Sequence, residues 1–144
     1  MYPDTITRYV EAISHTRKGL KVLIADDWPI EQLAFIETVR QYLPESTAEA
    51  VDQPGLDAVL NHSQQTYDLI VLEERLVLQQ PYEWYAQQLR AKYPDAKIAL
   101  FIDRENLHQL QTVSQLPVID IILTKCSSVE AIAEKFCLTF QEVR

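Results

Sequence analysis

The sequence contains only two glycines, Gly19 and Gly55, among 144 residues. A glycine-rich loop that cradles phosphate needs several glycines at close spacing, so nucleotide-binding loops of that kind are excluded. The two cysteines, Cys126 and Cys137, lie outside any CxxC motif. They suit a reducing compartment and are expected to be packing residues, not a disulfide. The three histidines are dispersed, so their spacing supports neither a metal cluster nor a catalytic triad.

Positive charge is also scarce. The sequence has 13 Lys and Arg but 21 Asp and Glu, which gives a formal net charge of -8. This balance argues against nucleic acid or an anionic membrane as the main partner. No apolar run is long enough to span a membrane, and no secretory signal is visible. We therefore expect a cytoplasmic protein. Its length and its 47% hydrophobic content predict one domain with its own core.

Four short apolar segments and a weaker one at 47–51, whose composition has low β-propensity, alternate with amphipathic segments along the chain. The stretch KVLIADD, residues 21–27, is the clearest, since its unbroken apolar run is typical of a strand buried on both faces of a parallel sheet. Strand–helix alternation predicts right-handed crossovers. The expected fold is therefore α/β and flavodoxin-like, a five-stranded parallel sheet with helices on both faces. We expect strands at 21–25, 47–51, 68–72, 97–102 and 118–124, and helices at 29–43, 55–63, 81–93, 103–115 and from 128 onward.

Two of these helices carry apolar stripes that we expect to face the sheet. In the first helix, apolar residues recur at three- and four-residue steps, which is the spacing of one helical face. The last helix begins at a capping box formed by Ser127 and Glu130. The expected inward stripes are Ile30, Leu33, Ile36, Val39 and Leu43 in the first helix, and Val129, Ile132, Phe136 and Phe140 in the last.

Residues 1–18 are expected to form an N-terminal helical extension ahead of a domain at 19–144. Ile6, Tyr9, Val10 and Ile13 fall on one face of this helix. Two interpretations stay open: the helix folds back over its own domain, or its stripe is a dimerisation or docking interface.

Charged side chains follow three of the predicted strands. Asp26 and Asp27 end the first strand, Glu73 ends the third, and Lys125 ends the fifth. Because ligand sites of open α/β sheets lie at the carboxyl ends of the strands, we expect these residues to converge. Three carboxylates beside one ammonium favour a bound divalent cation or a proton. Asp26, Asp27 and Glu73 are therefore candidate Mg²⁺ ligands, although no cofactor is required.

Four segments resemble the receiver domain of bacterial two-component response regulators, and most closely the receiver half of LuxR/NarL-type regulators. They read VLIADDWP at 22–29, YDLIVLE at 67–73, YPDAKIAL at 93–100 and DIILTK at 120–125. The resemblance covers about residues 20–141. It implies phosphoryl transfer from a kinase histidine to an aspartate after the third strand. An acidic pair holds Mg²⁺, a hydroxyl residue ends the fourth strand, and a lysine after the fifth strand contacts the phosphoryl group.

This chain departs from that pattern at three positions. Asp26 and Asp27 match the acidic pair and Lys125 matches the lysine, but Glu73 stands where the acceptor aspartate belongs. The longer side chain moves the reactive oxygen by about one methylene, which in-line transfer tolerates badly. Ile102, or Asp103 if the alignment slips by one residue, replaces the hydroxyl residue, and Ile122 replaces the aromatic residue that moves between a buried and an exposed position. The resemblance therefore implies a degenerate receiver that lacks the acceptor aspartate.

The sequence thus predicts a pseudo-receiver that is not an enzyme and that regulates other proteins by contact. Its expected partners are another signalling protein or a second copy of itself. The expected working surface is either the N-terminal stripe or the face formed by the fourth helix, the fifth strand and the fifth helix. Trp28 is expected to cover the site partly. The alternatives are a receiver phosphorylated or Mg²⁺-loaded by an atypical route, and a flavodoxin-like structural subunit.

Overall fold

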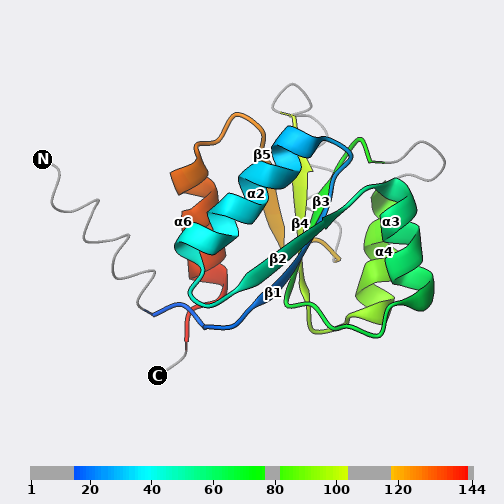
Figure 1. Ribbon diagram of the computed structural model, residues 1–144, viewed down its shortest axis with the longest axis horizontal. Helices are drawn as coiled ribbons and strands as arrows, with labels where there is room; N and C mark the ends of the chain where they lie inside the picture. The colour runs from blue at the N-terminus through cyan, green and yellow to red at the C-terminus, as the bar shows by residue number, and fades with distance from the viewer. Residues whose placement is uncertain (1–14, 77–81, 104–117, 143–144) are drawn as a thin grey trace, which may run out of the picture.

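The computed structural model describes residues 15–76, 82–103 and 118–142. In this part of the chain, five parallel strands form one sheet in the order β2-β1-β3-β4-β5 (Figure 1). The predicted five-stranded parallel sheet is therefore confirmed. Its strands are β1 (Lys21–Ala25), β2 (Thr47–Val51), β3 (Leu69–Glu73), β4 (Lys97–Ile102) and β5 (Ile121–Thr124).

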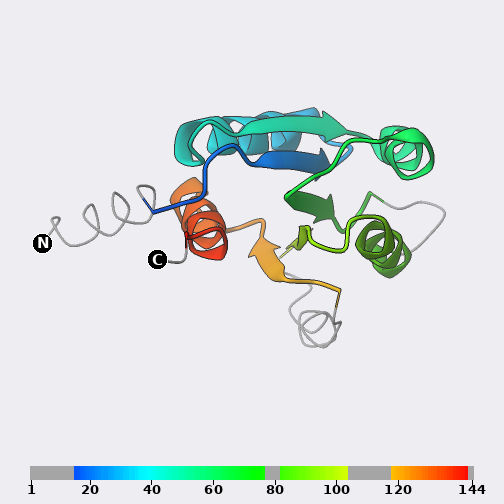
Figure 2. The ribbon, with the colours of Figure 1, turned by 90° about the horizontal axis from the view of Figure 1, so that it is seen from below.

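Four described helices cover both faces of this sheet, as the flavodoxin-like prediction requires. Figure 2 shows helices on both sides of the strands. The first pair is α2 (Pro29–Tyr42) with α6 (Val129–Thr139), and the second is α3 (Gln53–His62) with α4 (Tyr82–Lys92).

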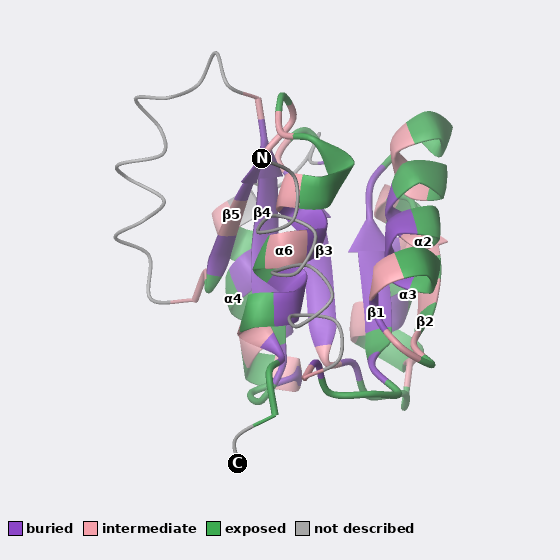
Figure 3. Ribbon diagram, turned by 90° about the vertical axis from the view of Figure 1, so that its left-hand side faces the viewer, coloured by how far each residue is buried: buried purple, intermediate pink, exposed green. Residues whose placement is uncertain are grey.

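Each face of the sheet has its own apolar core, and Figure 3 shows the central strands buried along their lengths. Every residue of β3 is buried, as an unbroken apolar run predicts for a strand covered on both faces. On the α2 and α6 side, the rings of Phe35 and Phe101 meet edge to face with centroids 4.8 Å apart. On the α3 and α4 side, Tyr85 and Leu89 belong to the same buried cluster as Leu23.

Some observed element boundaries differ from the predicted ones by a few residues, and at two helices the capping residue explains the difference. Helix α3 begins at Gln53, two residues before the predicted start, because the Asp52 carboxylate accepts a hydrogen bond from the Gly55 amide at 2.9 Å. Helix α6 is capped by Ser128 instead of Ser127, since the Ser128 hydroxyl accepts from the Ala131 amide at 3.1 Å. Strand β5 is shorter than predicted and begins at Ile121.

The inward stripe predicted for the first helix was wrong in its first half. Ile30 and Leu33 are 82% and 62% exposed, whereas Phe35, Thr38 and Val39 are buried. Phe35 packs on the sheet through Phe101, so this contact fixes the rotation of α2 and turns Ile30 outward. In α6, Val129 is likewise exposed, while the other three residues of its predicted stripe are buried.

Two predicted segments lie outside the described residues. These are residues 1–14 of the N-terminal extension, with Ile6, Tyr9, Val10 and Ile13, and most of the helix predicted at 103–115. Among the described helices, none has the length and apolar character needed to cross a membrane.

One exposed and one buried leucine of the α2 region test this packing. We expect Leu33→Ala to change the free energy of unfolding by no more than about 0.5 kcal/mol, because its side chain is exposed. Leu43→Ala should cost about 2–5 kcal/mol, because Leu43 is 1% exposed at the end of the same helix. Urea unfolding of both variants measures the difference. Equal losses would contradict the observed rotation of α2.

Candidate functional site

Glu73 is the centre of the candidate site and is fully buried, with 0% exposure. It ends β3, so its side chain projects at the carboxyl edge of the sheet beside the ends of β1 and β5. Its Oε1 accepts a hydrogen bond from Lys125 Nζ at 2.7 Å. Its Oε2 accepts one from the Arg75 amide at 2.8 Å. Both carboxylate oxygens of Glu73 are therefore occupied by donors of the chain itself.

Lys125 joins two acids across this edge. Its ammonium lies 3.4 Å from Glu31 Oε2 as well as 2.7 Å from Glu73 Oε1, and its side chain is 14% exposed. It also lies 5.4 Å from the centre of the Phe101 ring, within cation–π range. The predicted convergence of Glu73 and Lys125 is thus present in the structure.

Sequence analysis missed Glu31. This residue is the third residue of α2, and its side chain turns back over the end of β1 toward Lys125. The available signal was an acidic residue in the first turn directly after Asp26-Asp27-Trp28-Pro29, a position from which side chains reach back to the start of the helix.

Asp26 is 1% exposed and meets Glu31 within the site. Its Oδ1 accepts from the Trp28 amide at 2.8 Å, and the Gln32 side-chain amide donates to its backbone oxygen. In the described part of the chain, Asp26 Oδ2 and Glu31 Oε1 are buried oxygens without a hydrogen-bond donor. Two ionised carboxylates have no donor between them, whereas one shared proton satisfies both.

The electrostatics agree with a shared proton. Burial, the hydrogen bond to Glu31 and the nearby acids raise the pKa of Asp26 to about 8. Burial also raises the pKa of Glu73, and this effect is opposed by Lys125 and the Arg75 amide. With one proton on Asp26, the acids Asp26, Glu31 and Glu73 together with Lys125 carry about one negative charge in total.

Asp27 does not join the other acids. It is exposed, and its Oδ1 accepts a hydrogen bond from the Gln53 amide at 2.9 Å, which ties the end of β1 to the start of α3. The structure therefore brings Asp26 and Glu73 together with Lys125, but not Asp27. Within the described ranges, no group of three or more His, Cys, Asp or Glu side chains is arranged to hold a metal ion. The Lys125 ammonium lies between acids where a cation would be needed.

Ile102 and Ile122, which stand at the positions of the family's switch residues, make apolar contacts. Ile102 ends β4 with 0% exposure, and the half-buried Ile122 packs against it. Neither side chain can donate a hydrogen bond. Beside them, Glu74 Oε1 accepts from the Asp103 amide at 2.8 Å, and the Asp103 carboxylate pairs with Arg75. The ends of β3 and β4 are thus fastened to each other.

Trp28, which was expected to cover the site partly, is 54% exposed. Ile30 and Leu33, in the first turns of α2, are exposed as well. These three are half of the six large apolar side chains exposed in the described part of the chain. Large exposed apolar side chains, tryptophan above all, are candidates for contact with a protein partner.

A double-mutant cycle tests the central ion pair. We expect Lys125→Met to lower the free energy of unfolding by about 3–5 kcal/mol, because it leaves a buried carboxylate uncompensated. Glu73→Gln in the same chain should restore most of this loss. Urea unfolding of both single variants and the double variant measures the coupling. Additive losses would contradict an ion pair between these residues.

Stability should also depend on pH through Asp26. Its pKa rises from 3.8 to about 8 on folding, so the bound proton stabilises the fold fully below about pH 4 and this stabilisation is lost as pH rises through about 8. This group should lower the free energy of unfolding by up to about 1.4 kcal/mol per pH unit in that window. We expect Asp26→Asn to reduce this dependence of the free energy of unfolding on pH, measured by urea unfolding at a series of pH values.

Asp27→Asn is the matched control, because Asp27 is adjacent but exposed and bonded to Gln53. It should keep the wild-type slope. If Asp26→Asn has the wild-type slope as well, the proton is not held at this pair.

Comparison with family models finds no match, and comparison with curated proteins finds none either. Solved structures do resemble the chain. The receiver domain of a response regulator from Bacteroides fragilis has a TM-score of 0.69 at 12% identity, covering 88% of this chain and 100% of that one. A response regulator receiver protein from Sinorhizobium medicae has a TM-score of 0.65 at 22% identity, covering 86% and 98%.

A structure named as an adenylate cyclase, from Rhodopirellula baltica, has a TM-score of 0.66 at 12% identity and covers 85% of this chain and 90% of that chain. At such identities a likeness shows the fold and not the activity. Together with the strand order, these comparisons show that the chain has the fold of response regulator receiver domains.

Proposed function

We propose that this chain is a pseudo-receiver: a regulatory domain that accepts no phosphoryl group and acts by contact with other proteins. Its setting is bacterial signal transduction or transcription control, in the cytoplasm. It performs no catalysis and requires no cofactor. This proposal rests on the site, because the fold alone carries many functions.

The observation that carries the proposal is the state of Glu73. A phosphoryl acceptor needs a carboxylate oxygen that an incoming phosphorus atom can approach in line. Both oxygens of Glu73 are instead held by Lys125 and by the Arg75 amide, and the residue has no exposed surface.

The surroundings of Glu73 support the same conclusion. Lys125 already neutralises carboxylates of the chain, so it is not available to a phosphoryl group unless the pair breaks. The hydroxyl expected at the end of β4 is replaced by the buried Ile102. Magnesium does not fit the acids as they lie, because Asp27 bonds to Gln53 and Lys125 supplies the positive charge.

Protein partners fit the rest of the surface better than nucleic acid or membrane. The net charge of -8 disfavours both polyanions. The exposed Trp28, Ile30 and Leu33 give the molecule apolar surface of the kind that protein interfaces bury.

Incubation of the full chain with acetyl phosphate and Mg²⁺ tests the proposal. We expect its intact mass to stay unchanged under conditions that phosphorylate a typical receiver domain measured in parallel. A phosphoryl adduct that requires Mg²⁺ and is lost in Glu73→Gln would overturn the proposal and support the atypical receiver instead.

Magnesium titration followed by the fluorescence of Trp28 gives a second measurement. Trp84→Phe leaves Trp28 as the single tryptophan, two residues from Asp26. We expect no saturable response, since no Mg²⁺ site is assembled beside it. A saturable response that disappears in Asp26→Asn would contradict this part of the proposal.

A further inference from the structure

Strand β2 is an open edge of the sheet. Among the described strands it pairs only with β1, in register over all five of its residues. Natural edge strands are often protected by charged side chains, lysine above all, by proline or by a bulge. The β2 sequence TAEAV has no proline and no lysine, its one charged residue is Glu49, and its register with β1 is continuous. Thr47 and Glu49 are exposed.

The backbone of β2 offers hydrogen-bonding groups to a further strand. The Thr47 amide donates to Leu20 and the Val51 oxygen accepts from Asp26, at 2.9 and 3.0 Å. Residues of a strand alternate in the side to which their backbone groups point. The amide and carbonyl groups of Ala48 and Ala50 therefore point away from β1, and methyl side chains leave them uncovered.

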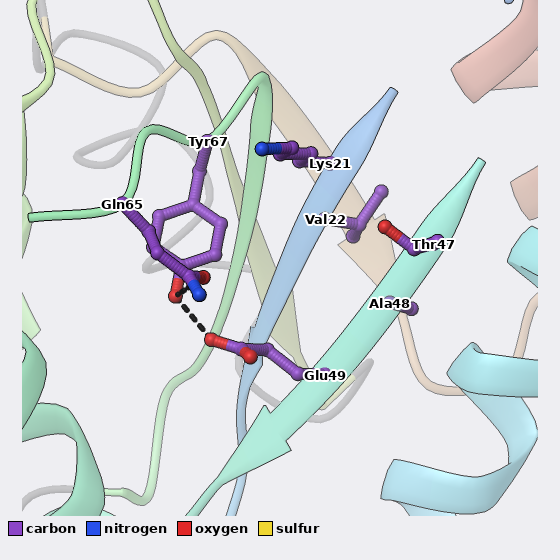
Figure 4. A pocket seen from close by; sticks show the side chains of 7 residues that line it. All are labelled: Lys21, Val22, Thr47, Ala48, Glu49, Gln65 and Tyr67. Carbon is purple, nitrogen blue, oxygen red and sulfur yellow. Dashed lines mark hydrogen bonds between the residues drawn. The ribbon is translucent and has the colours of Figure 1, made fainter. Parts of the chain in front are cut away.

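Two hollows flank this edge, one on each face of the sheet, and both include Thr47 and Ala48. Figure 4 shows the first, where Glu49 of β2 points toward the Tyr67 hydroxyl and Lys21 lies on the neighbouring strand. Its volume is about 230 Å³. The second, of about 190 Å³, lies between β2 and the α2 residues Ile36, Val39 and Arg40. An added strand places alternate side chains over the two hollows.

We propose that β2 pairs with β2 of a second copy of this chain, antiparallel and centred on Ala48, so that two sheets join into one. Charge argues against the neighbouring register. Centring on Glu49 would place two like charges directly opposite each other, which is destabilising. Centring on Ala48 places each Thr47 hydroxyl opposite Glu49 of the other copy.

The same register brings opposite charges together beyond the central pair. Lys21 is the β1 partner of Thr47, so it stands in the same row as Glu49 of the second copy. On the other face, α2 packs over β2, and its exposed Glu37 and Arg40 pair with each other at 3.2 Å. The two-fold axis brings the two α2 helices alongside each other, where these charges can also pair between copies. The contact is self-complementary, as a two-fold interface must be.

Disulfide trapping tests the register in the full chain. Opposed residues of a hydrogen-bonded antiparallel pair have Cα atoms about 5.5 Å apart, within disulfide range. In a Cys126→Ser background, which removes the exposed native thiol, Ala48→Cys should form a covalent dimer at least about tenfold faster than Ala91→Cys. Ala91 is an exposed helical alanine and provides the matched control. Equal rates would overturn the proposal.

Sedimentation of the unlabelled chain over a wide concentration range gives an independent measurement. We expect a monomer–dimer equilibrium that Ala48→Pro abolishes. Proline is tolerated where the amide points outward from an edge strand, so the monomer should keep its circular dichroism spectrum. A monomeric wild type at all concentrations, or a dimer unaffected by Ala48→Pro, would refute pairing through β2. A phosphorylation result does not bear on either measurement.

Discussion

The buried ion pair between Glu73 and Lys125 is the interaction on which the rest of the candidate site depends. A carboxylate with no exposed surface is costly unless a positive charge and hydrogen-bond donors compensate it. Lys125 supplies the charge from the end of β5, and the Arg75 amide supplies a donor from the chain just after β3. The pair therefore links separate strand ends and leaves neither group available to a ligand.

Most of the fold could be predicted from the sequence because its strands are unbroken apolar runs. β1, β2 and β4 were predicted with their observed boundaries, and Glu73 and Lys125 were expected to converge because parallel strands end at one edge. The weak apolar character of β2 did not prevent this, since the alternation of strands and helices required a strand there. Local pattern and topology agreed, which is typical of sequences that fold to one structure.

Side-chain direction around the helices could not be predicted in the same way. The apolar spacing of α2 allows more than one face to turn inward, and the Phe35–Phe101 contact selects a face that leaves Ile30 and Leu33 in solvent. The same rotation carries Glu31 toward Lys125. Asp27 was expected beside Asp26, but adjacent residues at a strand end point to opposite sides, and the Gln53 amide holds it toward α3. Each of these outcomes depends on a tertiary contact between distant residues.

A site whose central carboxylate is compensated by the chain itself differs physically from one whose charges are compensated only when a ligand binds. Phosphorylation of a receiver changes local charge by nearly two units, and that change can bias a bistable element. Here the charge of Glu73 is balanced by Lys125, and the proton on Asp26 removes another charge. Ile102 and Ile122 offer no hydrogen bond that a change of charge could make or break. Under the proposed function, a regulatory signal enters through binding of a partner at the surface, because the buried Glu73 is already compensated by Lys125 and the Arg75 amide.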